Sequence, residues 1–325
     1  MKPPRRPNPA LGYLLAVGAA VMWGVSGVVA RFLIGDGGYA PAELLFFRTG
    51  IAALLLLGWL RRRPGGLPPI PRKDLPAFLL LGGIGLVANQ GCYYLALSRV
   101  GVGYALLFQY TAPVMLMAYG VATRTERLTA GKILAAATAL AGCVLMLLGQ
   151  EGGTAAINVP GTLFAIGSGV GFSFYAVLGT RLQQRYATLP LMAYAFVIAS
   201  LTWSLLAPVW ALPWSQYGGT TVGFFLYLAI IATILPFGLF LASLRHLEPS
   251  RSSLTSMLEP VVAAGVAWGW LGETLGGWQL AGGGAVLGGV LLLQLETLLR
   301  PRPTLSPNEN VPEDQRVGAV RDWTN

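Results

Sequence analysis

The sequence predicts an all-α integral membrane protein with ten transmembrane helices, arranged as two inverted five-helix repeats. Three observations predict this fold: the composition, the length of the apolar segments, and an internal repeat. Of the 325 residues, 54% are hydrophobic and only 11% are charged. A soluble domain carries about 25% charged residues, so this chain has too few charges to cover a water-exposed surface.

Apolar stretches of about 18 to 25 residues lie between the charges, and this length crosses a ~30 Å hydrocarbon core. The predicted spans are 10–34, 42–60, 75–97, 102–121, 131–149, 160–181, 190–211, 220–242, 252–270 and 278–298. The first span follows Lys2, Arg5 and Arg6. Its apolar run is too long for a signal peptide, so we expect a retained helix.

The basic residues predict the topology. With the N-terminus in the cytoplasm, 19 of the 22 lysines and arginines fall in cytoplasmic segments, and only Arg31, Arg48 and Arg99 fall on the other side. This distribution is the positive-inside bias of membrane proteins. The net charge of +9 therefore reflects topology and the lipid bilayer, not a nucleic-acid partner. We expect a multi-pass protein of the bacterial inner membrane with both termini cytoplasmic.

An internal repeat predicts the architecture. A shift of 147 residues places Pro113 on Pro260, Glu126 on Glu273 and Gly142 on Gly289. A shift of 149 residues aligns the first and sixth spans and places Trp23 on Phe172. Five helices in each half mean that the second half enters the membrane from the opposite side. Many secondary transporters have this design and bind substrate near the midplane, between the repeats.

The expected organisation follows from this division. It comprises a cytoplasmic N-terminus (1–9), a first repeat (10–149), a link (150–159), a second repeat (160–298) and a disordered cytoplasmic tail (299–325). Glycines four residues apart let membrane helices approach closely. The pairs with this spacing are Gly167 with Gly171, Gly265 with Gly269, and Gly284 with Gly288. Some such pairs arise by chance among 43 glycines, and we favour close packing for the cluster Gly282-Gly283-Gly284 with Gly288-Gly289.

Short motifs in both halves carry a family resemblance. The second half contains Leu258-Glu259-Pro260-Val261, then Gly272-Glu273-Thr274-Leu275 and a Gly-rich last span. The first half has a weaker copy in Ala112-Pro113-Val114, Glu126-Arg127-Leu128-Thr129 and Gly142, preceded by Phe46-Phe47-Arg48. Over residues 10–298 the chain resembles the EamA family of the drug/metabolite transporter superfamily. The resemblance implies a ten-helix transporter, commonly an exporter of small metabolites such as amino acids. Ala112 departs from the pattern, since no glutamate precedes Pro113.

Glu259 is the principal candidate for chemistry, because ionisable groups inside a membrane are costly and tend to be functional. Burial disfavours the charged carboxylate. A carboxyl group that alternates between two environments could carry a proton or hold a substrate ammonium group. A structural role is equally open, because Pro260 removes a backbone donor and a polar neighbour can settle the resulting kink.

Arg48 and three prolines also have two interpretations. The Arg48 guanidinium could bind a substrate carboxylate, or it could pair with Glu43 or with helix-end carbonyls, and we favour the structural role. Pro113, Pro236 and Pro260 predict helix breaks. Such breaks are tolerated at depth where the freed backbone groups face protein or a water-filled cavity. They predict a pathway lined by these helices, with packing kinks as the alternative.

Aromatic and amide side chains complete the predicted binding site. Mid-depth tyrosines need hydrogen-bond partners and often line a cavity. The predicted substrate-binding residues are Trp23, Arg48, Asn89, Gln90, Tyr93, Gln109, Tyr110, Tyr175, Phe237 and Glu259. Such a pocket suits a small amphipathic or zwitterionic solute better than a polyanion, because Arg48 alone would counter negative charge.

Other classes of protein are less well supported. The sequence has one histidine, His246, in a loop, and two cysteines, Cys92 and Cys143, in apolar spans. It therefore predicts no metal site, no cofactor and no enzyme, and it lacks the phosphate-binding motif of ATPases. We expect an exporter of a small metabolite that acts by alternating access and is plausibly monomeric. The alternatives are an importer, a lipid flippase, or a scaffold without transport.

Overall fold

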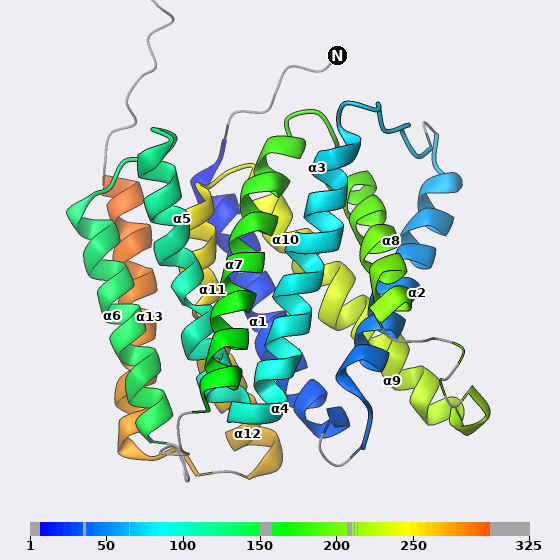
Figure 1. Ribbon diagram of the computed structural model, residues 1–325. Helices are drawn as coiled ribbons and strands as arrows, with labels where there is room; N and C mark the ends of the chain where they lie inside the picture. The colour runs from blue at the N-terminus through cyan, green and yellow to red at the C-terminus, as the bar shows by residue number, and fades with distance from the viewer. Residues whose placement is uncertain are drawn as a thin grey trace, which may run out of the picture.

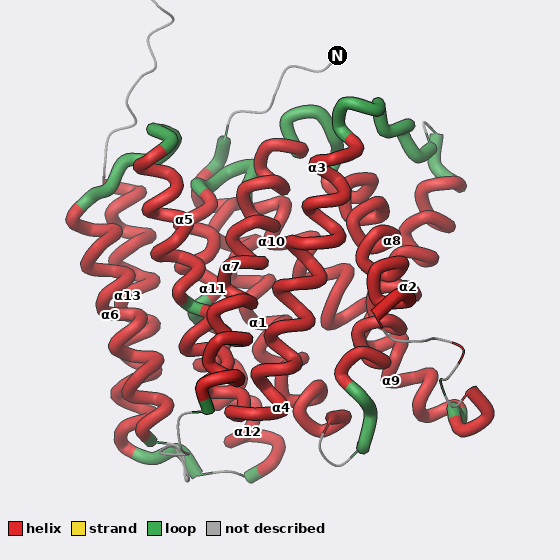
Figure 2. The backbone as a smooth tube through the Cα atoms, in the orientation of Figure 1, coloured by secondary structure: helices red, strands yellow, loops and turns green. Residues whose placement is uncertain are grey.

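The computed structural model describes residues 7–34, 37–64, 66–149, 158–206, 210, 212, 214–272 and 274–299. Within these ranges the chain forms helices joined by loops and contains no strand, as Figure 2 shows. The predicted all-α class is confirmed. Glu273, most of the predicted link and the tail from residue 300 lie outside the described residues.

The described residues of the first half form seven helical elements. They are α1 (Pro9–Ile34), α2 (Pro41–Arg61), α3 (Leu75–Leu79), the π-helical η1 (Leu80–Leu86), α4 (Val87–Gln109), α5 (Thr111–Ala122) and α6 (Ala130–Leu148). Gly101 interrupts α4 with a φ of 76°, a backbone conformation that glycine adopts without the steric cost of a Cβ. This kink separates the span Leu75–Gly101 from the span Gly103–Ala122.

The second half repeats this order with small differences. Its elements are α7 (Val159–Leu182), α8 (Thr188–Leu206), the 3₁₀ turn η3 (Trp214–Gln216), α9 (Gly219–Ala229), the π-helical η4 (Ile230–Ile234), α10 (Leu235–Ser243), α11 (Pro249–Ser256), α12 (Glu259–Leu271) and α13 (Gly277–Leu299). α9, η4 and α10 form one apolar span, Gly219–Ser243.

Nine helical segments of the described residues are long and apolar enough to cross a membrane. The predicted span 252–270 is the one that differs. The chain there is divided at Met257–Leu258 into α11 and α12, which have 8 and 13 residues. Each is too short to cross a bilayer alone, so the count of ten remains a prediction.

The two halves interlock instead of packing as separate bodies. The most extensive contacts pair α4 with α7, α6 with α13, α2 with α8 and α1 with α10. Figure 1 shows α6 and α13 side by side at one edge of the bundle and α2 and α9 at the other. Every one of these four helix pairs joins an element of the first half to an element of the second, so the interface between the halves runs through the bundle.

Glycines allow the closest of these contacts. A Cβ at Gly171 would lie 2.4 Å from the backbone N of Asn89, and one at Gly282 would lie 2.5 Å from the carbonyl O of Gly142. The predicted close packing at Gly167 and Gly171 is confirmed. For Gly265, Gly269, Gly284 and Gly288 it is wrong, since no neighbouring atom of the described structure would lie within 4 Å. The last helix approaches α6 through Gly282 and Gly289, two members of the glycine cluster expected to pack closely.

The outer surface carries many exposed apolar side chains. Leu14, Leu54 and Leu205 are 69%, 71% and 85% exposed, and most of the other exposed large hydrophobic residues also lie on the predicted spans. In water such a surface would promote aggregation. In a bilayer it contacts lipid tails, which agrees with a multi-pass membrane protein.

Irregular helix geometry recurs at equivalent places in the two halves. Tyr110 separates α4 from α5, and Met257, its equivalent under the shift of 147 residues, lies in the break between α11 and α12. The two π-helical segments also overlap under this shift. The helix breaks near Pro113 and Pro260 were expected, whereas the π-helical segments were not. Such segments occur frequently at functional sites.

Candidate functional site

A cavity of about 80 Å³ lies among helices of both halves. Its wall contains residues from α1, α2, α4, α5, α7, α10, η4, α11 and α12. The lining residues are Trp23, Ser26, Gly27, Ala30, Arg48, Asn89, Gln90, Tyr93, Tyr94, Gln109, Tyr110, Ala112, Pro113, Phe172, Ala232, Phe237, Ser253, Ser256 and Glu259. This volume holds a few water molecules or part of a small solute.

Nine of the ten predicted binding residues line this cavity. Tyr175 does not: it is fully buried beside the wall, with its ring 5.5 Å from that of Phe237. Pro113 lines the cavity, whereas Pro236 and Pro260 lie next to the lining residues Phe237 and Glu259. The structure therefore gathers residues from distant parts of the sequence into one place.

Glu259 is the first residue of α12, directly after the helix break. Its partly exposed side chain lines the cavity, and its carboxyl group forms no hydrogen bond or ion pair with the described residues. The backbone here is held by α1, because a Cβ at Gly24 would lie 2.7 Å from the Glu259 carbonyl O. The structure thus presents a carboxyl group to the cavity without a protein partner.

Further unpaired polar atoms belong to residues that line the same cavity. Both amide atoms of Gln90 and the hydroxyl groups of Tyr93 and Tyr110 are buried and have no hydrogen-bond partner in the described structure. Because buried polar groups are almost always hydrogen-bonded, unpaired ones at a cavity wall indicate a place for a polar ligand or water.

Asn89 and Gln109 are paired, unlike their neighbours. Gln109 Nε2 donates to Asn89 Oδ1 at 3.1 Å, and Ser168 Oγ donates to the Asn89 carbonyl O at 2.8 Å. The first bond joins two parts of α4 and the second joins α4 to α7, and together they fix the stretch of chain that carries Gln90. Asn89 and Gln109 therefore hold the cavity wall around Gln90 in place.

Arg48 is held by the protein. Its Nε donates to Thr233 Oγ1 at 2.8 Å, its Nη1 to Tyr94 Oη at 2.8 Å, and its Nη2 to the Ala232 carbonyl O at 2.6 Å. Two of these partners belong to η4. Pro236 has no N–H to donate to Ala232 in the α-helical pattern, so Arg48 supplies a donor to that carbonyl. Glu43 is not its partner; the Glu43 carboxylate accepts from Tyr217 Oη at 2.5 Å.

Aromatic rings form the apolar part of the wall. The Trp23 ring lies 5.2 Å from that of Phe237 and 6.1 Å from that of Phe172, both edge-on. Phe172 was not among the predicted site residues, although the repeat places it opposite Trp23. Ser253 and Ser256 were also missed. Ser253 and Ser256 are three residues apart in α11 and lie on one face of that helix, and Glu259 follows directly after the break between α11 and α12.

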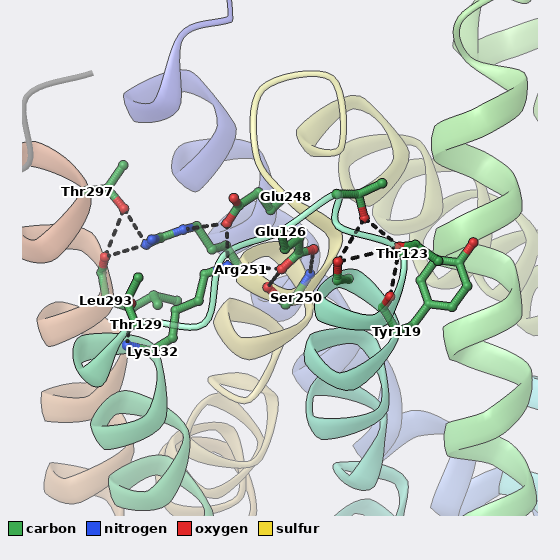
Figure 3. A network of polar contacts seen from close by, with 12 residues as sticks. Tyr119, Thr123, Glu126, Thr129, Lys132, Glu248, Ser250, Arg251, Leu293 and Thr297 are labelled. Atoms are coloured by element: carbon green, nitrogen blue, oxygen red, sulfur yellow. Dashed lines mark hydrogen bonds and ion pairs between the residues drawn. The ribbon is translucent and has the colours of Figure 1, made fainter. Parts of the chain in front are cut away.

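Figure 3 shows part of a second polar cluster, here named the ion network, which consists of Glu126, Lys132, Glu248, Arg251 and Glu296 and contributes no residue to the cavity wall. Lys132 Nζ lies 3.0 Å from Glu126 Oε2 and 2.6 Å from Glu248 Oε2. Arg251 Nε lies 3.0 Å from Glu248 Oε2, and its Nη2 lies 3.3 Å from Glu296 Oε2. The ion network therefore joins the loop before α6 and α6 itself, from the first half, to α11 and α13, from the second.

Neither region has the composition of a metal site. Among the described residues, no cluster of three or more His, Cys, Asp or Glu side chains could hold a metal ion. Cys92 and Cys143 are free thiols. The cavity wall offers one carboxyl group, neutral hydrogen-bond donors and acceptors, and aromatic faces. It also contains the Arg48 guanidinium group, which is already hydrogen-bonded to the protein.

Known proteins resemble the chain over most of its length. The uncharacterized inner membrane transporter YicL of Salmonella typhimurium is 26% identical over 90% of this chain and 97% of that protein. The threonine/homoserine exporter RhtA of Escherichia coli is 27% identical over 84% of this chain and 87% of its own length. The probable terminal-alkyne amino-acid exporter of Streptantibioticus cattleyicolor is 26% identical over 84% of this chain and 91% of its own length.

A solved crystal structure shares the fold. It superposes with a TM-score of 0.73 over 91% of this chain and 98% of that chain, at 22% sequence identity. The model of the EamA-like transporter family matches residues 10–148 and again residues 159–295. Together with the helical fold and the internal cavity, these two matches show that the chain belongs to the EamA-like transporter family.

Proposed function

We propose that this protein is a secondary transporter that exports amino acids or similar small amphipathic solutes by alternating access. One observation carries the proposal: a cavity between the two halves whose wall combines unpaired polar atoms with aromatic rings. A solute that brings its own donors and acceptors satisfies Gln90, Tyr93, Tyr110 and Glu259, and its apolar part packs against Trp23 and Phe237.

The names of two relatives support the direction and the solute class. One is a threonine/homoserine exporter and the other a probable exporter of terminal-alkyne amino acids. The irregular helical segments at equivalent places in both halves support alternating access, because a break or a π-helical segment lets one part of a helix move relative to the other. We place both termini in the cytoplasm on the basis of the positive-inside bias and treat the protein as a monomer.

Flux measurements in proteoliposomes test this proposal. Purified protein is reconstituted and the movement of a panel of radiolabelled amino acids is followed, with and without an imposed pH gradient. We expect saturable flux of at least one amino acid above that of protein-free liposomes. A gradient effect would indicate proton coupling, and equal rates would indicate exchange or downhill movement. Absence of flux for the whole panel under both conditions would contradict the exporter proposal.

A further inference from the structure

The two charged groups of the cavity wall, Glu259 and Arg48, are in opposite situations. Glu259 forms no hydrogen bond or ion pair with the described residues. Arg48 uses all three of its nitrogens on Tyr94, Thr233 and the Ala232 carbonyl. Negative charge in the cavity is therefore available to a ligand, whereas the hydrogen-bonding capacity of the cation is largely spent on the protein.

The neighbours of Glu259 reinforce this difference. Gln90 is only 5% exposed, and its carbonyl oxygen and amide nitrogen both lack a partner in the described structure. The Tyr93 and Tyr110 hydroxyls are also without a partner in the described structure, and both residues line the same cavity as Glu259. A carboxylate, an amide oxygen and two hydroxyl oxygens are four potential acceptors, and an ammonium group has three N–H donors.

The aromatic wall suits the same kind of ligand. The Trp23 ring lines the cavity with Phe237, and Gly24 brings the backbone of α1 against Glu259. An aromatic face attracts a cation through its quadrupole, and tryptophan does so most strongly. An anionic group would find no such support, because releasing Arg48 would leave the Ala232 carbonyl without that donor.

From this geometry we propose that the cavity contains an ammonium-binding subsite formed by Glu259, Gln90, Tyr93 and Tyr110. The protein recognises the ammonium end of its solute and does not require a carboxylate. This inference rests on the proposed function and specifies its substrate class as small primary amines with an apolar part. That class contains amino acids and their decarboxylated forms, and it excludes solutes without an amine. Arg48 is a positioning residue that holds η4.

The contribution of the carboxylate can be isolated with three matched compounds: leucine, its decarboxylated amine 3-methylbutylamine, and its deaminated acid 4-methylpentanoate. Binding of each to the protein in lipid nanodiscs is measured by calorimetry at pH 7. We expect leucine and the amine to bind within about three-fold of each other. The acid should bind about 10- to 100-fold more weakly, the range expected for loss of one hydrogen-bonded charge.

Two variants test the role of Glu259, one at the site itself and one as a control. Glu259→Gln keeps the shape of the side chain and removes its charge, and we expect it to weaken amine binding by about 10- to 100-fold. Glu43→Gln changes a carboxylate outside the cavity and should leave amine binding unchanged. Thermal unfolding of each variant shows that it is folded.

The remaining outcomes would overturn the inference. An affinity for the acid equal to or above that for the amine rejects the subsite. Failure of all three compounds to bind the folded wild-type protein rejects it as well. Equal binding of the amine to Glu259→Gln and to wild type also rejects it. Failure of the proposed function looks different. Binding of the amine without flux of any solute in proteoliposomes would reject transport while retaining the subsite, and amino-acid flux with no amine binding would do the reverse.

Discussion

The cavity and the ion network are both polar regions inside an apolar bundle, and they differ in how their polar groups are satisfied. In the ion network, Lys132 is 1% exposed and contacts two carboxylates, and Glu126 also accepts hydrogen bonds from the backbone N and the hydroxyl of Ser250. In the cavity, Gln90, Tyr93 and Tyr110 have no partner in the described structure. One helix, α11, contributes to both regions.

The difference separates groups that stabilise the fold from groups that are available to a ligand. A buried charge without a partner is costly, so the buried pair of Lys132 and Glu126 resists separation of the elements it joins. An unpaired polar atom at a cavity wall makes the protein less stable, and the cost is offset only when a ligand or water binds. Substitutions in the two regions should therefore change stability in opposite directions.

The largest effect is expected when one partner of the ion network is removed. In Lys132→Met, Glu126 stays buried without its cation, and we expect the free energy of unfolding to fall by about 3–5 kcal/mol. Unfolding by SDS in mixed micelles measures this change. Arg127→Met removes an exposed charge from the same loop and is the control, with an expected change within about 0.5 kcal/mol. Equal losses in both variants would show that burial of the pair is not the cause.

Arg48 sharpens the comparison, because it lines the cavity and is nevertheless paired. Arg48→Met removes three hydrogen bonds, and we expect the free energy of unfolding to fall by about 2–3 kcal/mol, since hydrogen bonds to charged groups are worth about 1.5–3 kcal/mol. Pro236→Ala restores a backbone N–H that can serve the Ala232 carbonyl. The double variant should therefore be more stable than Arg48→Met alone. If Pro236→Ala lowers the free energy of unfolding of Arg48→Met further, Arg48 does not compensate for the proline.

The contact between α7 and α4 tests the framework of the cavity wall. Gly171→Ala places a Cβ against the backbone of Asn89, and we expect a loss of about 1–3 kcal/mol from the resulting displacement. The control is Gly265→Ala, in a helix position with no described atom within 4 Å of a new Cβ. It should be neutral or more stable by up to about 1 kcal/mol, because alanine favours the helix. Similar losses at both sites would show that the close approach is not limiting.

The smallest effect has the opposite sign. Tyr110→Phe removes a buried hydroxyl that has no partner in the described structure, and we expect the protein to become more stable by about 1 kcal/mol. Solute transport should fall in the same variant, which flux in proteoliposomes measures. Tyr186→Phe is the matched comparison, because the Tyr186 hydroxyl donates to Asp74 Oδ2 at 2.9 Å and its loss should destabilise the protein. A stability loss in Tyr110→Phe would show that the hydroxyl is paired in the native state.

Much of the site could be predicted from individual residue types. A glutamate, two amides and several tyrosines within apolar spans are costly unless they serve a purpose, so nine cavity residues could be named in advance. Tyr175 was predicted to line the cavity but lies beside its wall, because the sequence of a helix does not reveal the direction in which a side chain points. Phe172, Ser253 and Ser256 were missed as lining residues because phenylalanine and serine are ordinary in membrane helices.

The sequence by itself determined the membrane class, the repeat and the location of the helix breaks near Pro113 and Pro260. Composition, the spacing of matching residues and proline stereochemistry do not depend on how the helices pack. Only the tertiary structure decided which polar groups are satisfied. Lys132 meets Glu248, and Arg48 meets Ala232, across more than a hundred residues of sequence. Such partners depend on how the helices of the two halves pack, and the same packing leaves Glu259 without one among the described residues.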